Sequence, residues 1–123
     1  MTGVRPVRPH LSAPAIRLAG VLAFAIPFAL LAGAYISQYG FDLFPCEMCW
    51  WQRYPHFAAL AVSVPALVLL ARGGHEVARA PIAVAAVAIL VSGVIGGFHA
   101  GVEYGWWTGI TECATSAAVG SGD

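Results

Sequence analysis

The stretch Phe44–Arg53, FPCEMCWWQR, lies between two long apolar runs, and the rest of the chain is arranged around it. Its two cysteines, Cys46 and Cys49, are spaced i, i+3, so they can close a small disulfide ring that is reactive rather than structural. Arg53 follows Cys49 at i+4, and on a helix these two side chains share a face. A fixed cation beside a thiol favours the thiolate, the form that attacks disulfides and donates electrons. The stretch therefore predicts a redox site.

The composition indicates an integral membrane domain. Of the 123 residues, 59% are hydrophobic and only 10% are charged, which is too apolar for a soluble domain of this size. The formal net charge is zero and no basic run occurs, so we expect no nucleic-acid partner. The cysteine count is three, and an odd count leaves one thiol without a mate inside the chain.

Three apolar runs predict three membrane-spanning helices, at about residues 18–37, 46–71 and 80–98. A helix rises about 1.5 Å per residue, so about 20 residues cross a hydrocarbon core of about 30 Å. A cleaved signal peptide is the alternative for the first run. The second helix could begin as late as Pro55, because a proline disfavours helical geometry in the residue before it. We expect the longer helix, which begins near Cys46.

The arginines predict the orientation. Five of the six basic residues lie in the tail of residues 1–17 and in the loop of residues 72–79, and arginine-rich segments stay in the cytoplasm. The three cysteines then lie on the opposite face, which in a bacterium is the periplasm, where disulfides persist. Residues 114–123 form a short polar tail after the membrane domain of residues 18–113.

Two segments resemble the bacterial disulfide bond formation protein B (DsbB) family, whose members are quinone-linked oxidases that recharge the periplasmic dithiol oxidase DsbA. They are CEMCWWQR at residues 46–53 and HAGVEYGWWTG at residues 99–109, which leads to Cys113. The resemblance covers about residues 15–113. It implies an all-α fold from a four-helix-bundle family in the bacterial inner membrane. Ubiquinone or menaquinone would be the cofactor, with a DsbA-like thiol oxidase and the lipid bilayer as partners.

The resemblance also implies a role for each matching residue. Cys49 corresponds to the sulfur next to the quinone ring, and Cys46 to the sulfur that exchanges with Cys113. Arg53 corresponds to the arginine that the quinone reaction requires. Family members continue through another cysteine and a fourth helix, which this sequence lacks. We therefore expect a truncated member with weak turnover, and an inactive or structural membrane fragment is the alternative function.

Three further side chains have both a functional and a structural interpretation. Trp50 could contact a quinone ring, although aromatic residues at this depth are first of all interfacial anchors. His99 could bind a quinone oxygen, or could cap the end of its helix. Glu103 is more readily interpreted as a solvated or structural residue. Arg53 itself could be a snorkelling anchor rather than part of the site.

Other cofactor classes fit the sequence less well. Zinc could be bound by Cys46, Cys49, Cys113 and His99. That site would leave Arg53 beside a thiolate cluster with no purpose, so we expect no resident metal. A c-type haem is disfavoured because Trp50 stands where the attachment motif needs histidine. A thioredoxin-like site is disfavoured because no strand–helix–strand pattern surrounds the two cysteines.

Overall fold

The chain folds as three long helices. The computed structural model describes residue 3 and residues 11–110, and in that part the helices are α1 (Ala13–Gly40), α2 (Glu47–Ala71) and α3 (His75–Glu103). Each of the three is long and apolar enough to cross a membrane, and residues 11–110 contain no strand. The expected all-α membrane fold with three spanning helices is confirmed, and the chain is a multi-pass membrane protein.

The helices extend beyond the uncharged runs that predict them. α1 already includes Arg17, and α3 includes Glu76 and Glu103 at its two ends. The absence of charge marks the part of a helix that lies in hydrocarbon, whereas a helix continues into the interface, where charged side chains reach water. α2 begins at Glu47, so Pro55 lies inside the helix. Glu47 stands in the first turn of α2, where a negative charge interacts favourably with the helix dipole.

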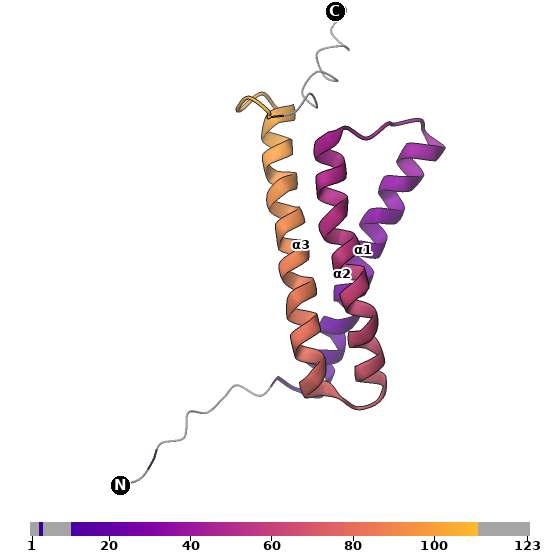
Figure 1. Ribbon diagram of the computed structural model, residues 1–123, viewed down its shortest axis with the longest axis vertical. Coiled ribbons are helices and arrows are strands. Elements are labelled where there is room, and N and C mark those ends of the chain that lie inside the picture. The colour runs from indigo at the N-terminus through magenta and orange to yellow at the C-terminus, as the bar shows by residue number, and fades with distance from the viewer. Residues whose placement is uncertain (1–2, 4–10, 111–123) are drawn as a thin grey trace, which may run out of the picture.

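Successive helices run in opposite directions, and α2 packs against both α1 and α3 (Figure 1). The α1–α2 connection and the C-terminal end of α3 lie together at the upper end of the molecule in this view, and the α2–α3 turn lies at the lower end. Gly73 forms that turn with a positive φ of 80°, a conformation that favours glycine. α1 leans away from α2 toward the upper end (Figure 1).

Small clusters of buried side chains hold the helices together along their length. The lower cluster contains Ile16, Leu70 and Ala78, the middle cluster Ala23, Ala59 and Ala85, and the upper cluster Met48 and Val102. A side chain at Gly20 would overlap the end of Leu70, so glycine lets α1 approach α2 closely in the lower half. The three helices are therefore in contact below, while the upper half has room for a cavity.

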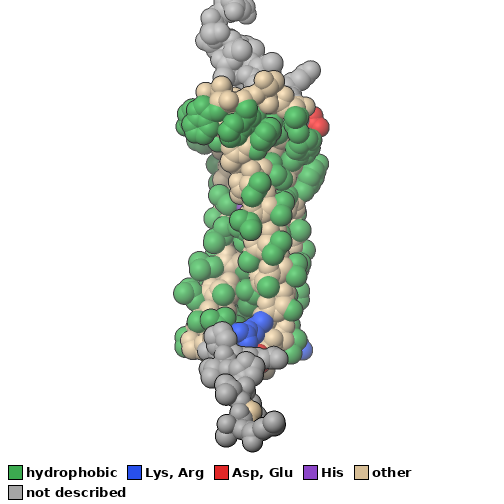
Figure 2. Space-filling view, turned by 90° about the vertical axis from the view of Figure 1, so that its left-hand side faces the viewer, with side chains coloured by type: hydrophobic (Ala, Val, Ile, Leu, Met, Phe, Trp, Pro, Cys, Tyr) green, Lys and Arg blue, Asp and Glu red, His purple; other side chains and the backbone are tan. Residues whose placement is uncertain are grey.

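The outer surface is a band of apolar side chains with charged groups at the ends. Figure 2 shows hydrophobic side chains along the whole length of the helices, arginine side chains at the lower end and acidic side chains at the upper end. Arg79 forms an ion pair with Glu76 at 3.1 Å, at the start of α3. An apolar band of this kind suits contact with lipid chains, and the ends of the molecule differ in charge.

Candidate active site

The two cysteines lie at the N-terminal end of α2. Cys46 is the N-cap residue with an extended backbone, and Cys49 lies in the first turn of the helix. Their sulfur atoms are 3.3 Å apart, which is contact distance and well beyond the length of about 2.05 Å of an S–S bond. Cys46 is disulfide-bonded, whereas Cys49 is a free thiol.

Arg53 lies one turn further along α2 and is only 5% exposed. Its Nη1 donates a hydrogen bond of 2.8 Å to Oε1 of Gln38, near the end of α1. The guanidinium also lies over two rings, at 4.8 Å from the ring centroid of Tyr35 and 4.7 Å from that of Trp50. Cation–π contacts of this kind are stronger when the charge is buried. Arg53 is thus fixed between α1 and α2 and does not extend toward water as a snorkelling anchor does.

Trp50, a predicted quinone contact, lies against Arg53 and near the ring of Tyr54. It is not among the described residues that line the cavity next to Cys49. Trp50 therefore packs against the guanidinium of Arg53 and does not line the cavity. The two residues that hold Arg53 from α1, Tyr35 and Gln38, were not singled out by the sequence, because they belong to another helix. Their spacing of i, i+3 at the aromatic end of the first span is the signal that could have found them.

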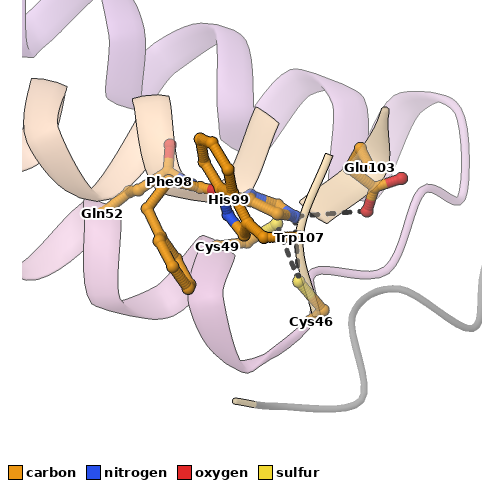
Figure 3. A network of polar contacts seen from close by, with 7 residues as sticks. All are labelled: Cys46, Cys49, Gln52, Phe98, His99, Glu103 and Trp107. Atoms are coloured by element: carbon orange, nitrogen blue, oxygen red, sulfur yellow. Dashed lines mark hydrogen bonds and ion pairs between the residues drawn. The ribbon is translucent and has the colours of Figure 1, made fainter. Parts of the chain in front are cut away.

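His99, near the C-terminal end of α3, brings the third helix to the cysteines (Figure 3). Nε2 of Gln52 donates a hydrogen bond of 2.8 Å to Nδ1 of His99. Since that Nδ1 accepts, the proton of the neutral ring lies on Nε2. This Nε2 is 3.8 Å from Sγ of Cys46 and 3.3 Å from Oε1 of Glu103. Glu103 is thus linked to the site through His99, a connection that the sequence did not predict.

The turn after α3 fixes this end of the site. Trp107 folds back onto α3, where its Nε1 donates a hydrogen bond of 3.0 Å to the carbonyl oxygen of Phe98, and the two rings stack at 5.7 Å (Figure 3). Any side chain at Gly101 would overlap the Trp107 ring. Gly105 makes the turn with a φ of 75°. Gly101, Gly105 and Trp107 therefore fold the chain back onto the end of α3, next to His99.

Met48 ties the start of α2 to the end of α3. It is fully buried and packs with Val102, and Cys46 and Trp51 cover the pair. Because Met48 lies between the two cysteines in sequence, its burial fixes their position relative to His99. Met48, the apolar residue inside the C-x-x-C motif, therefore has a structural role.

A cavity of about 600 Å³ opens beside Cys49. It is lined on one side by apolar side chains and on the other by a small set of polar ones, an arrangement typical of sites for small organic molecules. Most of the polar lining comes from α2 and α3, with Ser37 from α1, and α1 and the α1–α2 connection supply most of the apolar lining. The polar residues are Ser37, Cys49, Gln52, Arg53, His56, Ser92 and His99, and the apolar ones include Leu30, Leu31, Leu43, Phe44 and Ile89.

A buried pair below Gln52 was also missed by the sequence. Oγ of Ser92 donates a hydrogen bond of 2.9 Å to the backbone carbonyl of Gln52, and it lies 2.9 Å from Nε2 of His56. Since the hydroxyl donates to the carbonyl, its oxygen accepts from the imidazole. This leaves Nδ1 of His56 without a partner among the described residues. His56 follows Gln52 at i+4, and this spacing is the signal that places it on the same face.

Three metal-ligating side chains meet at the site. The ligand atoms of Cys46, Cys49 and His99 lie within 4.8 Å of one another. These are three of the four residues of the zinc alternative. The fourth, Cys113, lies outside the described residues, so its predicted role remains a prediction.

Comparison with known proteins gives one family. The model of the family described as "Disulfide bond formation protein DsbB" matches residues 16–121. The uncharacterized protein RP370 of Rickettsia prowazekii (strain Madrid E) is 25% identical over 89 residues, which are 72% of this chain and 49% of that protein. The chain thus spans about half the length of the curated relative it matches. No solved structure matches the chain.

Proposed function

Since the chain belongs to the DsbB family, we propose that it is a membrane thiol–disulfide oxidoreductase that takes electrons from a DsbA-like dithiol protein and passes them to a quinone. The observation that carries the proposal is the position of Cys49, a free thiol at an apolar cavity of about 600 Å³ that also contains a buried arginine. A thiol placed in this way can deliver electrons to a small apolar acceptor.

The first half of the reaction takes place at the sulfur pair. The two thiols of the partner become a disulfide while the Cys46–Cys49 disulfide becomes two thiols, so two electrons and two protons enter the pair. Cys46 is the sulfur that exchanges, with Cys113 as its partner in the relay. Cys49 is the leaving sulfur, and it lies in the first turn of α2, with Arg53 one turn further along the same helix.

The cavity suits a quinone in size and in chemistry. Cavities of about 300–1,000 Å³ hold molecules of this kind, and the apolar lining of Leu30, Leu31 and Ile89 suits the ring of ubiquinone or menaquinone. A bound quinone supplies a two-electron, two-proton acceptor. Arg53 would hold one of its oxygens by a hydrogen bond, and the Nε2–H of His99 would reach the other once it leaves Glu103. Gln38 occupies one of the five N–H donors of Arg53, and the planar group is held in place by the rings of Tyr35 and Trp50.

The direction of the chain in the membrane follows from the same proposal. Arg72 and Arg79 lie at the end of the molecule opposite the cysteines, with the α2–α3 turn. We place that end in the cytoplasm and the cysteines in the periplasm of a bacterial inner membrane, because basic loops stay inside and disulfides persist outside. Labelling of cysteines introduced at the two ends of α3 by a membrane-impermeant reagent in intact spheroplasts tests the orientation.

Re-oxidation of the reduced chain tests the function. The full chain is reduced in detergent, freed of reductant and mixed with ubiquinone or menaquinone, and the free thiols are counted by alkylation over time. We expect loss of two thiols per chain with formation of one quinol, and no such reaction in Cys49→Ser. Thiols that persist in the presence of both quinones would contradict the proposal and favour an inactive or structural membrane protein.

A further inference from the structure

We propose that the reduced cysteine pair, together with His99, forms a binding site for a thiophilic divalent cation, with zinc the best fit. The cation and the Cys46–Cys49 disulfide exclude each other. The ligands are the two sulfurs and Nε2 of His99, which come from the start of α2 and the end of α3 (Figure 3). This site goes beyond the redox function, because it is a reversible site of the reduced chain and not a resident metal centre.

The distances between the three ligand atoms fit zinc. In tetrahedral coordination, Zn–S bonds of about 2.3 Å and Zn–N bonds of about 2.0–2.1 Å place neighbouring ligand atoms about 3.6–3.8 Å apart. In the structure the sulfurs are 3.3 Å apart, and Sγ of Cys46 is 3.8 Å from Nε2 of His99. All three ligand atoms lie within 4.8 Å of one another. The sulfur–sulfur and sulfur–nitrogen pairs therefore differ from this spacing by about half an ångström or less, and side-chain shifts of up to about an ångström bring all three ligand atoms to it.

The surroundings of His99 supply what a zinc-bound imidazole needs. A histidine that binds through Nε2 carries its proton on Nδ1 and donates it to an outer acceptor. Here Gln52 faces Nδ1 at 2.8 Å, and rotating its amide by half a turn exchanges the donor for the acceptor Oε1. In the present orientation, Oε1 of Gln52 lies 3.3 Å from where a Cβ at position 96 would be. Because Gly96 has no Cβ, the amide has room to rotate. Glu103 is 3.3 Å from Nε2, so its carboxylate adds negative charge beside the cation.

Metal binding and the redox reaction compete for the same sulfurs. Zinc takes both cysteines as thiolates, so its binding releases two protons from two thiols. Oxidation of the pair joins the sulfurs and removes both ligands. In this structure Cys46 is disulfide-bonded while Cys49 is a free thiol, so the site forms only after the disulfide of Cys46 is reduced. Bound zinc would thus hold the pair in its reduced form, since a ligand stabilises the state to which it binds.

Titration of the full chain in detergent tests the inference. The reduced chain, free of chelator and of quinone, is titrated with Zn²⁺ against a chromophoric chelator, and Co²⁺ serves as a probe for thiolate-to-metal charge-transfer absorption. We expect one cation per reduced chain and none in the oxidised chain. Cys49→Ser and His99→Ala should each weaken binding about tenfold or more. His75→Ala, the matched control at the other end of α3, should bind like the wild type.

Two further variants separate this set of ligands from a set that includes Cys113. Cys113→Ser should keep the affinity for Zn²⁺. A loss of Zn²⁺ affinity in this variant would assign the third ligand to Cys113 and overturn the proposal. Gln52→Glu should bind more tightly than the wild type, because a carboxylate is a better outer partner for a zinc-bound histidine. Equal affinity of the wild type and His99→Ala, or binding to the oxidised chain, would also overturn it.

Adding the quinone shows whether this inference and the proposed function stand together. If both are right, ubiquinone oxidises the reduced chain and saturating Zn²⁺ slows that reaction. Re-oxidation without any zinc binding would refute the metal site and leave the redox function intact. Zinc binding without re-oxidation by either quinone would refute the redox function and leave the metal site intact.

Discussion

Replacing Arg53 by alanine removes the one arginine among the described residues that line the apolar cavity, and the effect on quinone reduction can be worked out from its surroundings. Arg53 is only 5% exposed, and Gln38 occupies one of its donors. A hydrogen bond from a charged donor contributes about 1.5–3 kcal/mol. Loss of one such bond to a quinone oxygen corresponds to a decrease in kcat/KM of about 10-fold to 150-fold.

Arg53→Lys gives a graded second case. Lysine keeps the positive charge but lacks the planar group that lies over the rings of Tyr35 and Trp50. We expect about a tenfold loss, between the wild type and Arg53→Ala. The assay follows quinone absorbance with the reduced chain in detergent over a range of quinone concentrations. Arg79→Ala is the control, since this arginine lies at the other end of the molecule in an exposed ion pair with Glu76.

Loss of Arg53 also removes contacts between α1 and α2, so stability must be measured alongside the rate. Thermal unfolding of each variant in the same detergent shows whether a slower reaction reflects fewer folded molecules. If folded Arg53→Ala reduces quinone at the wild-type rate at every quinone concentration, the role assigned to this arginine is wrong.

The remaining predictions concern the packing around the site. Met48→Ala should lower the free energy of unfolding by about 2–5 kcal/mol, because it empties a fully buried position; an unchanged denaturation midpoint would contradict this packing. Gly101→Val should displace Trp107 from α3 and change its fluorescence, whereas an unchanged emission spectrum would place the ring elsewhere. Ser92→Ala should cost about 1–3 kcal/mol, because the His56 imidazole then loses its acceptor; equal unfolding midpoints would show that this bond contributes little.

The sequence predicted the features that depend on neighbouring residues. Uncharged runs long enough to cross a bilayer indicated the three helices, and the i, i+4 spacing placed Arg53 on the face of Cys49. The ends of the helices were less predictable, since charge marks the limits of the hydrocarbon and not of the helix. This is why α1 and α3 extend to Ala13 and Glu103.

Features that depend on contacts between helices were beyond sequence reasoning. Gln38 and Gln52 are ordinary polar residues until the packing of α1 against α2 and of α2 against α3 brings them to Arg53 and His99. The cavity itself depends on the way α1 leans away from α2 (Figure 1), and one sequence holds no direct signal for such a tilt. The link from Glu103 to Cys46 through His99 arises in the same way.

Filling the cavity without touching its polar groups tests the central claim most directly. A Cβ added at Gly93 or at Gly97 of α3 would meet open space, but of these two glycines only Gly93 lines the cavity. Re-oxidation of the reduced pair by ubiquinone is measured in Gly93→Phe and in the matched Gly97→Phe. We predict that Gly93→Phe loses the reaction while Gly97→Phe keeps it. Equal rates in the two folded variants would show that electrons leave Cys49 by a path that does not use this cavity.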